Sequence, residues 1–420
     1  MLIFTSIYCI VDGYFVSNFV GKTPFAAINF IYPFLSILSS IGFMFGTGGS
    51  ALIAKTVGEG KNDRANSIFS MIVLSSIICG LVLTGIGFVL LEPVAKMLGA
   101  EGQLLEDSLL YGRIYLISLT GCVLQFEFES LCSAAEKPKL GLYSTVAAGI
   151  INIVLDALFV AVFPFGLAGA AVATTISQIT GGIIPLFCFG KKSKGLLKFV
   201  KPKFCFSDMK RICSNGFSEL LNNISMSIVS VLYNWQLLKY AGEYGIAAYG
   251  VIMYVTLIFL AVFIGYSVGL APVISYHYGA QNHKELKSIL RKSLVIIGTG
   301  SLIMFGLSEM SAYPLSVIFV NYDRTLFDIT KRAFLIYSFS YLFSGFAIFG
   351  SAFFTALNNG RISAAISFLR TIVFQVAAVI LLPLIWDTDG IWVSVTVAEA
   401  LAAFLSLILI YAKRKSYHYM

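Results

Sequence analysis

The chain has 420 residues, of which 58% are hydrophobic and only 12% are charged. Soluble domains carry about 25% charged residues, and the mean hydropathy of +0.87 also indicates a membrane protein. Apolar stretches long enough to cross about 30 Å of hydrocarbon recur along the chain. The net charge of +8 comes from basic residues in short loops between these stretches, so a nucleic-acid-binding protein is excluded.

Apolar stretches and breakers together predict about twelve transmembrane helices. The breakers include GKTP at 21–24, GEGKND at 58–63, EKPK at 136–139 and DTDG at 387–390. No positive segment or cleavage site opens the chain, so no signal peptide is expected. The helices are expected near residues 1–20, 25–54, 65–91, 108–134, 141–163, 166–190, 211–239, 246–276, 288–319, 329–356, 362–386 and 388–412.

The one long polar connection lies in the middle of the chain and predicts two halves. A shift of 221 positions aligns one half with the other without a gap and places glycines on glycines: Gly21 on Gly242, Gly48 on Gly269 and Gly58 on Gly279. Two copies of six helices share one orientation, because six is even. The predicted fold is an all-α membrane protein with two parallel six-helix repeats around a central cavity. Its expected domains are an N-terminal lobe (1–190), a basic linker (191–210), a C-terminal lobe (211–412) and a tail (413–420).

Basic residues are distributed unequally between alternate loops. Loops on the side of the linker and the tail hold 21 Lys and Arg, against 6 in the loops of the other side. Loops rich in Lys and Arg stay in the cytoplasm. We therefore expect a multi-pass protein of the cell membrane, bacterial in origin, with a cytoplasmic linker and C-terminus.

Ionisable residues inside membrane helices are costly and mark functional sites. Asp12 lies nine residues before the outer loop at position 21, or about 13 Å deep. Asn152 and Asp156 are four residues apart and share one face of a helix. Carboxylate and amide oxygens suit a small cation or a proton relay, while the alternative is a pair of acids satisfied by helix–helix hydrogen bonds.

Other acids in predicted helices have less definite roles. Glu219 and Glu399 either line a substrate cavity or pair with Arg370 or polar neighbours, and the sequence does not decide between these. Glu127 and Glu129 fall near the cytoplasmic end of their helix, so we expect them to snorkel or to pair with Arg113 or with loop lysines.

Motifs of enzymes and of ATP-driven pumps are not found in the sequence. The run GTGGS at 46–50 lacks the Lys-Ser/Thr of a nucleotide site, so it is interpreted as a helix-packing segment. No Ser–His–Asp or metalloprotease pattern occurs, and no C-x-x-C pair that would indicate a metal site. The chain is therefore predicted not to be an enzyme and to need no cofactor beyond a coupling ion, Na⁺ or H⁺.

Several spaced motifs resemble the multidrug and toxic compound extrusion (MATE) family, in particular the bacterial branch that includes the DinF and MepA proteins. These are IVDGYFVSNFVGKTPFAAINFIYPF, GFMFGTGGSALIAKTVGEGK, AAEKPKLGLYSTVAAGIINIVLDALF, GLAGAAVATTISQ and YNWQLLKYAGEYGIAAYGVI. The resemblance implies two six-helix lobes and export of lipophilic cations in exchange for Na⁺ or H⁺. It also implies a first-lobe cation site, whose positions match Asp12, Asn152, Asp156 and Thr174.

The sequence departs from the family pattern in three places. The first helix starts about twenty residues later than usual, which raises the alternative of a truncated first helix. An acid that some members carry in the seventh helix falls near Met226, and one after the tenth helix is replaced by ALNNGR at 356–361. A second-lobe cation site is therefore not expected.

The sequence favours a secondary antiporter that exports lipophilic, mostly cationic drugs or toxic metabolites by alternating access. Its expected partners are small organic cations and membrane lipid, with no nucleic acid and no obligatory protein partner. A flippase for lipid-linked precursors is one alternative, although such proteins carry a more cationic cavity. A membrane receptor or an intramembrane enzyme is a further alternative, which the tandem repeats and the intramembrane Asp pair disfavour.

Overall fold

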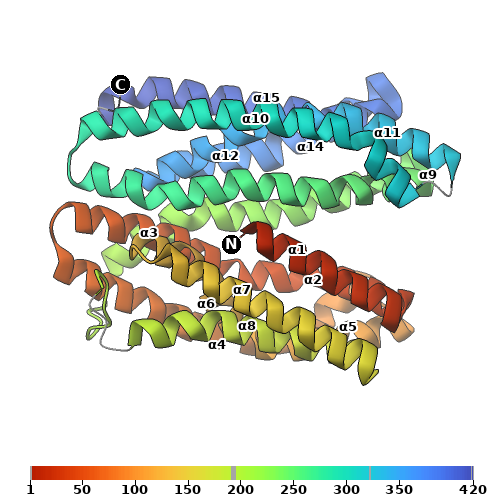
Figure 1. The fold of residues 1–420 in the computed structure, drawn as a ribbon, viewed down its shortest axis with the longest axis horizontal. Helices are drawn as coiled ribbons and strands as arrows, with labels where there is room; N and C mark the ends of the chain where they lie inside the picture. The colour runs from red at the N-terminus through yellow and green to blue at the C-terminus, as the bar shows by residue number, and fades with distance from the viewer. Residues whose placement is uncertain (1, 191–194, 321–322, 418, 420) are drawn as a thin grey trace. The chain divides into compact units, whose positions relative to one another are not determined.

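The computed structural model describes residues 2–190, 195–320, 323–417 and 419, and the regular elements in these ranges are helices (Figure 1). The chain divides into two compact units, Met1–Leu220 and Leu221–Met420. The first contains α1 (Leu2–Phe15), η1 (Val16–Val20), α2 (Lys22–Ser39), α3 (Ile41–Gly58), α4 (Asn62–Met97), α5 (Gly102–Ile117), α6 (Leu119–Ala134), α7 (Pro138–Asp156), η2 (Ala157–Val162) and α8 (Gly166–Gly190).

The long helix α9 (Phe206–Gly279) begins in the first unit and continues into the second. The other elements of the second unit are α10 (His283–Val320), α11 (Arg324–Ser338), α12 (Tyr341–Ala356), α13 (Gly360–Phe368), η3 (Leu369–Phe374), α14 (Gln375–Leu381) and α15 (Pro383–Tyr417). The elements η1, η2 and η3 are short π-helical segments.

The glycines that align in the sequence occupy matching places in the two units. Gly21 separates η1 from α2 with a φ of +121°, and Gly242 breaks the helical path of α9 with a φ of +62°. Positive φ is open to glycine at little steric cost because it has no Cβ atom. The two aligned glycines therefore mark the same break, between the first and second helices of each repeat.

The ends of the helices that follow are related by the same offset of 221 positions. Helix α3 ends at Gly58 and α9 ends at Gly279, while α4 and α10 start at Asn62 and His283, again 221 positions apart. The bent pair α5 and α6 turns by 59°, and its counterpart, α11 and α12, turns by 47°. Both units are thus copies of one arrangement, as the sequence predicted.

Helix lengths and surfaces fit a bilayer. Eight helices are long and apolar enough to span a membrane, and the two bent pairs raise this number to ten. Segment α1–η1 and the part of α9 before Gly242 complete a set of twelve among the described residues. Helix α4 exposes a row of large apolar side chains, as a lipid-facing helix does: Leu74, Ile78, Leu81, Val82, Ile86 and Val89.

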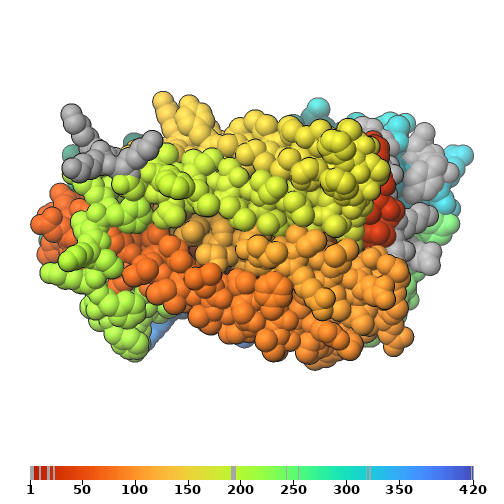
Figure 2. Space-filling view, turned by 90° about the horizontal axis from the view of Figure 1, so that it is seen from below, coloured from red at the N-terminus to blue at the C-terminus, as the bar shows by residue number. Residues whose placement is uncertain are grey.

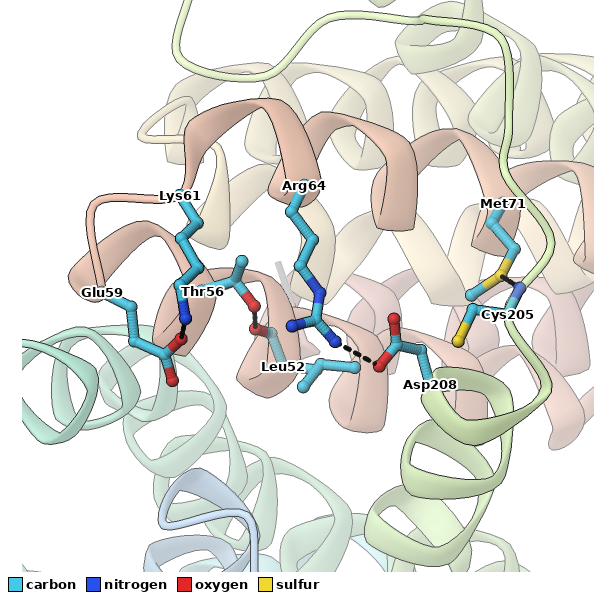
Figure 3. A network of polar contacts seen from close by, with 8 residues as sticks. All are labelled: Leu52, Thr56, Glu59, Lys61, Arg64, Met71, Cys205 and Asp208. Atoms are coloured by element: carbon cyan, nitrogen blue, oxygen red, sulfur yellow. Dashed lines mark hydrogen bonds and ion pairs between the residues drawn. The ribbon is translucent and has the colours of Figure 1, made fainter.

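The described part of the linker lies against the start of α4. Figure 2 shows it at one end of the first unit, beside α4 in orange. Its backbone N–H groups donate to side chains of α4, from Lys198 to Asn66 Oδ1 (2.8 Å) and from Val200 to Ser70 Oγ (2.9 Å). Arg64 of α4 forms an ion pair with Asp208 of α9 at 2.8 Å (Figure 3). The segment therefore packs as part of the first unit, while 191–194 of the predicted linker lie outside the described residues.

The GTGGS segment packs α3 closely against its neighbours, as the sequence predicted. A Cβ atom added at Gly48 would lie 2.1 Å from the carbonyl oxygen of Ile212 in α9, and one added at Gly46 would lie 3.0 Å from the backbone of Glu127 in α6. Small residues let the backbones of membrane helices approach each other. These glycines therefore fix where α6 and the start of α9 lie against α3.

Candidate cation site in the first unit

Contacts between α1, α7 and α8 set the relative depth of these helices. Gly149 of α7 leaves room for the rings of Phe4 and Tyr8 of α1, which lie 2.4 and 2.7 Å from where its Cβ atom would be. The hydroxyl of Ser177 in α8 donates to the carbonyl of Ala148 in α7 at 2.8 Å. Together, these contacts hold the three helices at one level.

The four predicted residues lie one or two helical turns away from these contacts. Asp12 lies one turn beyond Tyr8 on α1, and Asn152 and Asp156 lie about one and two turns beyond Gly149 on α7. Thr174 lies about one turn before Ser177 on α8. Three separate helices therefore present these side chains at similar depth.

Several buried side-chain oxygens at this level have no hydrogen-bond partner among the described residues. Asp156 is fully buried and Asn152 is 2% exposed, while Asp12 and Thr174 are partly buried. Asp12 Oδ1, both carboxyl oxygens of Asp156, Asn152 Oδ1 and Thr174 Oγ1 are buried and make no hydrogen bond. Buried polar groups are normally paired, so this group of unpaired oxygens requires an explanation.

The carboxyl groups of Asp12 and Asp156 lie close enough to interact with each other. Two carboxylates in a low-dielectric interior cannot both stay ionised without a compensating positive charge. The oxygens of Asn152 and Thr174 add neutral ligands of the hard type that small cations prefer. No group of three or more His, Cys, Asp or Glu among the described residues is placed to hold a metal ion. The arrangement fits a shared proton or a monovalent cation.

Both acids precede a change in helical hydrogen bonding. Asp156 is the last residue of α7 and is followed directly by η2, and Asp12 lies four residues before η1. A small cluster of Val16, Val160 and Ala170 packs η1 against η2 and the start of α8. Single π-helical turns are rare and occur frequently at functional sites. The sequence did not predict them, because a π-turn leaves no clear compositional signal.

Glu399 and Glu219 lie in different units. Glu399 of α15 pairs with Arg370 of η3 at 2.8 Å and is 6% exposed. Of the two interpretations that the sequence left open for Glu399, the structure therefore shows the ion pair. Glu219 is partly buried on α9, in the portion that belongs to the first unit.

The sequence interpretation of Glu127 and Glu129 was wrong. Both residues of α6 are buried, with exposed fractions of 0% and 6%, and neither forms an ion pair with a side chain in the described ranges. Arg113, one of their expected partners, is exposed and lines a groove with Glu92 and Lys96 between α4 and α5. The expectation failed because a residue's distance from a helix end does not tell which face of the helix is packed.

A helical membrane fold of two repeats, with a group of buried, unpaired side-chain oxygens in the first, is that of a two-lobe membrane transporter. Its residues 1–158 and 220–381 match the model of the MatE family. These segments make up most of the chain, and the chain belongs to this family.

Curated relatives are similar over nearly the whole length. The chain is 24% identical over 417 residues to the multidrug export protein MepA of Staphylococcus haemolyticus, and 25% identical over 415 residues to MepA of Staphylococcus aureus strain MSSA476. Each alignment covers 97% of this chain and 90% of the relative.

Solved structures share the fold. A multidrug resistance MATE family transporter of the MOP superfamily in its outward-facing conformation matches with a TM-score of 0.94 and 20% identity, over 100% of this chain and 95% of the other. A MOP superfamily transporter from Pyrococcus furiosus, described as having a binding pocket of reverse polarity and a different function, matches with a TM-score of 0.92 and 21% identity, over 100% of this chain and 94% of the other. At this identity the likeness establishes the fold, and the function must be argued from the site.

Proposed function

We propose that the chain exports lipophilic organic cations across the bacterial cell membrane in exchange for H⁺ or Na⁺. The observation that carries this proposal is the group of unpaired oxygens around the neighbouring carboxyls of Asp12 and Asp156. Relatives named as multidrug exporters support the direction and the substrate class.

Occupancy of the site supplies the coupling. A proton or Na⁺ bound between Asp12 and Asp156 relieves their repulsion and favours the arrangement of α1, α7 and α8 described here. Loss of the ion leaves two buried negative charges and favours a different arrangement. A ligand shifts a conformational equilibrium only by its differential affinity for the two states, and this site provides such a difference.

The flippase alternative is not favoured. A flippase for anionic lipid-linked precursors needs unpaired basic residues facing its substrate. Here Arg370 is neutralised by Glu399, and Arg113 lies in an exposed groove with Glu92. The curated relatives are named as multidrug exporters.

Proteoliposomes with imposed gradients test the proposal. The purified chain should move ethidium against its gradient when an opposing H⁺ or Na⁺ gradient is imposed, and it should not move an anionic dye of similar size. Liposomes containing the Asp12→Asn, Asp156→Asn double variant are the matched control. Absence of ethidium movement under either gradient, with folded protein in the membrane, would contradict the proposal.

A further inference from the structure

Glu127 is a second buried acid in the first unit, away from the cation site. It lies on α6 and is 0% exposed, and neither carboxyl oxygen makes a hydrogen bond to a residue that the structure describes. Ser76 of α4, also fully buried, lies beside this carboxyl group, and its hydroxyl oxygen is likewise unpaired. A carboxyl group at this position inside a membrane helix bundle requires an explanation.

The packing around Glu127 leaves it in an apolar interior. Gly46 of α3 lies against its backbone, as described above. Leu124 and Leu131, about one turn before and after Glu127 on the same face of α6, are 4% and 0% exposed and belong to the main apolar cluster of the unit. The ionised form of Glu127 would therefore lose its hydration without replacement.

Charged and titratable groups on the helices packed around α6 interact with other partners. Lys55 of α3 interacts with Glu59 and Arg211, and Cys79 of α4 interacts with Cys213. On the other helices of the unit, electrostatic interactions connect Asp156 of α7 with Asp12, Cys188 of α8 with Cys132, Tyr32 of α2 with Tyr115, Arg113 of α5 with Glu92, and Glu129 of α6 with Cys122 and Cys132. None of these described groups supplies a positive charge to Glu127.

A metal cation does not fit this position. Hard cations bind several oxygen ligands at once, whereas Ser76 is the one side chain among the described residues that we find placed to interact with the carboxyl group. A proton needs only one oxygen, and the neutral acid can then donate a hydrogen bond to a neighbouring hydroxyl after a small rotation.

We propose that Glu127 is a proton-binding site of the first unit, held as the neutral acid by the packing of α3 and α4 on α6. Its proton stays bound while these helices are closed and exchanges with water when they separate. Proton binding therefore stabilises the closed packing, and this holds whether or not the cation site drives export.

Infrared spectroscopy of the purified full-length chain in lipid nanodiscs tests this proposal directly. A neutral carboxylic acid has a C=O stretching band well separated from the bands of a carboxylate. At neutral pH the Glu127→Gln variant should lose one carboxylic acid's share of this band. Glu101→Gln, which removes an exposed acid at the start of α5, should leave the band unchanged, and Asp156→Asn should leave the Glu127 component in place.

A second variant keeps the test decisive if Glu127→Gln does not fold. Ser76→Ala retains Glu127 and removes the neighbouring hydroxyl, so the frequency of the same component should shift. Labelling with ¹³C-glutamate should move this component and leave those of aspartate in place. The proposal is overturned if Glu127→Gln leaves the carboxylic acid band at full strength or, where that variant does not fold, if Ser76→Ala leaves the glutamic acid component at its wild-type frequency, because Glu127 would then be ionised.

Discussion

The guanidinium of Arg370 donates three hydrogen bonds to the carboxylate of Glu399. Nε lies 3.0 Å from each carboxyl oxygen, and Nη2 lies 2.8 Å from Oε1. The pair joins η3 to α15 in the interior of the second unit. Among the described residues, no basic side chain forms an ion pair with Asp12 or Asp156 of the first unit. The buried acid of the second unit is thus neutralised by an arginine, whereas we propose that a bound proton or cation neutralises the two acids of the first.

Replacing Arg370 alone should destabilise the second unit more than replacing both members of the ion pair. Arg370→Met leaves Glu399 buried without a counter-charge, which should cost about 3–5 kcal/mol. In the Arg370→Met, Glu399→Gln double variant no charge is left unpaired, so much of this loss should be recovered. Thermal unfolding of the purified proteins in detergent measures both. Equal losses in the single and double variants would contradict the argument that the unpaired charge of Glu399 causes the loss.

Close backbone packing gives a second prediction. A Cβ atom added at Gly216 of α9 would lie 1.9 Å from the carbonyl oxygen of Met44 in α3. Gly216→Ala should therefore force the helices apart and cost about 1–3 kcal/mol. Gly85→Ala is the matched control, because this exposed glycine of α4 has nothing within 4 Å of its added Cβ atom. It should raise stability by about 0.5–1 kcal/mol, and equal effects of the two variants would contradict the packing argument.

The repeat could be predicted, and the buried acids of the proposed cation site could be singled out, because membrane constraints leave a clear signal in the sequence. Gly21 and Gly242 stand out as breakers between apolar stretches, and Asp12 and Asp156 stand out as charges within them. Because residues four apart lie on one face of a helix, Asn152 could be placed on the same face as Asp156 without knowing any tertiary contact.

Features that depend on packing between distant segments could not be predicted. Glu127 is buried because Gly46 lets α3 cover that face of α6, which no local pattern reveals. The pairing of Glu399 with Arg370 depends on how α15 packs on η3, so the sequence left two alternatives open. The basic charge of the linker could be read from the sequence. The contacts of residues 198–205 with α4 could not, because they join segments that are far apart in the chain.

Labelling from either side of the membrane tests the proposed orientation. Lys203 is exposed, and its backbone N–H donates to Ser67 near the start of α4, while Glu101 is exposed just beyond the other end of this helix. A helix of 36 residues is about 54 Å long, so the two positions lie on opposite sides of the bilayer. In a background without native cysteines, Lys203→Cys should react with an impermeant maleimide only after the membrane is opened. Glu101→Cys should react in intact cells, and the reverse pattern would invert the topology.

Replacing Asp156 tests the cation site in the first unit. Asp156→Asn keeps the size of the side chain but removes the charge that must be neutralised in each cycle. It should abolish gradient-driven ethidium efflux while leaving expression, thermal stability and part of the ethidium binding intact. Asp63→Asn, which neutralises an exposed acid in the first turn of α4, should transport at the wild-type rate.

Comparison of the two gradients then identifies the coupling ion. If Asp12 and Asp156 share a proton, wild-type efflux should follow the pH gradient and be indifferent to Na⁺. If they bind Na⁺, Thr174→Ala should lower the apparent affinity for Na⁺ by removing a neutral ligand, with a smaller effect on the maximal rate. Wild-type efflux rates in Asp156→Asn under a verified gradient would refute the assignment of the site. Glu219 would then be the next acid to replace, because Glu399 is already neutralised by Arg370.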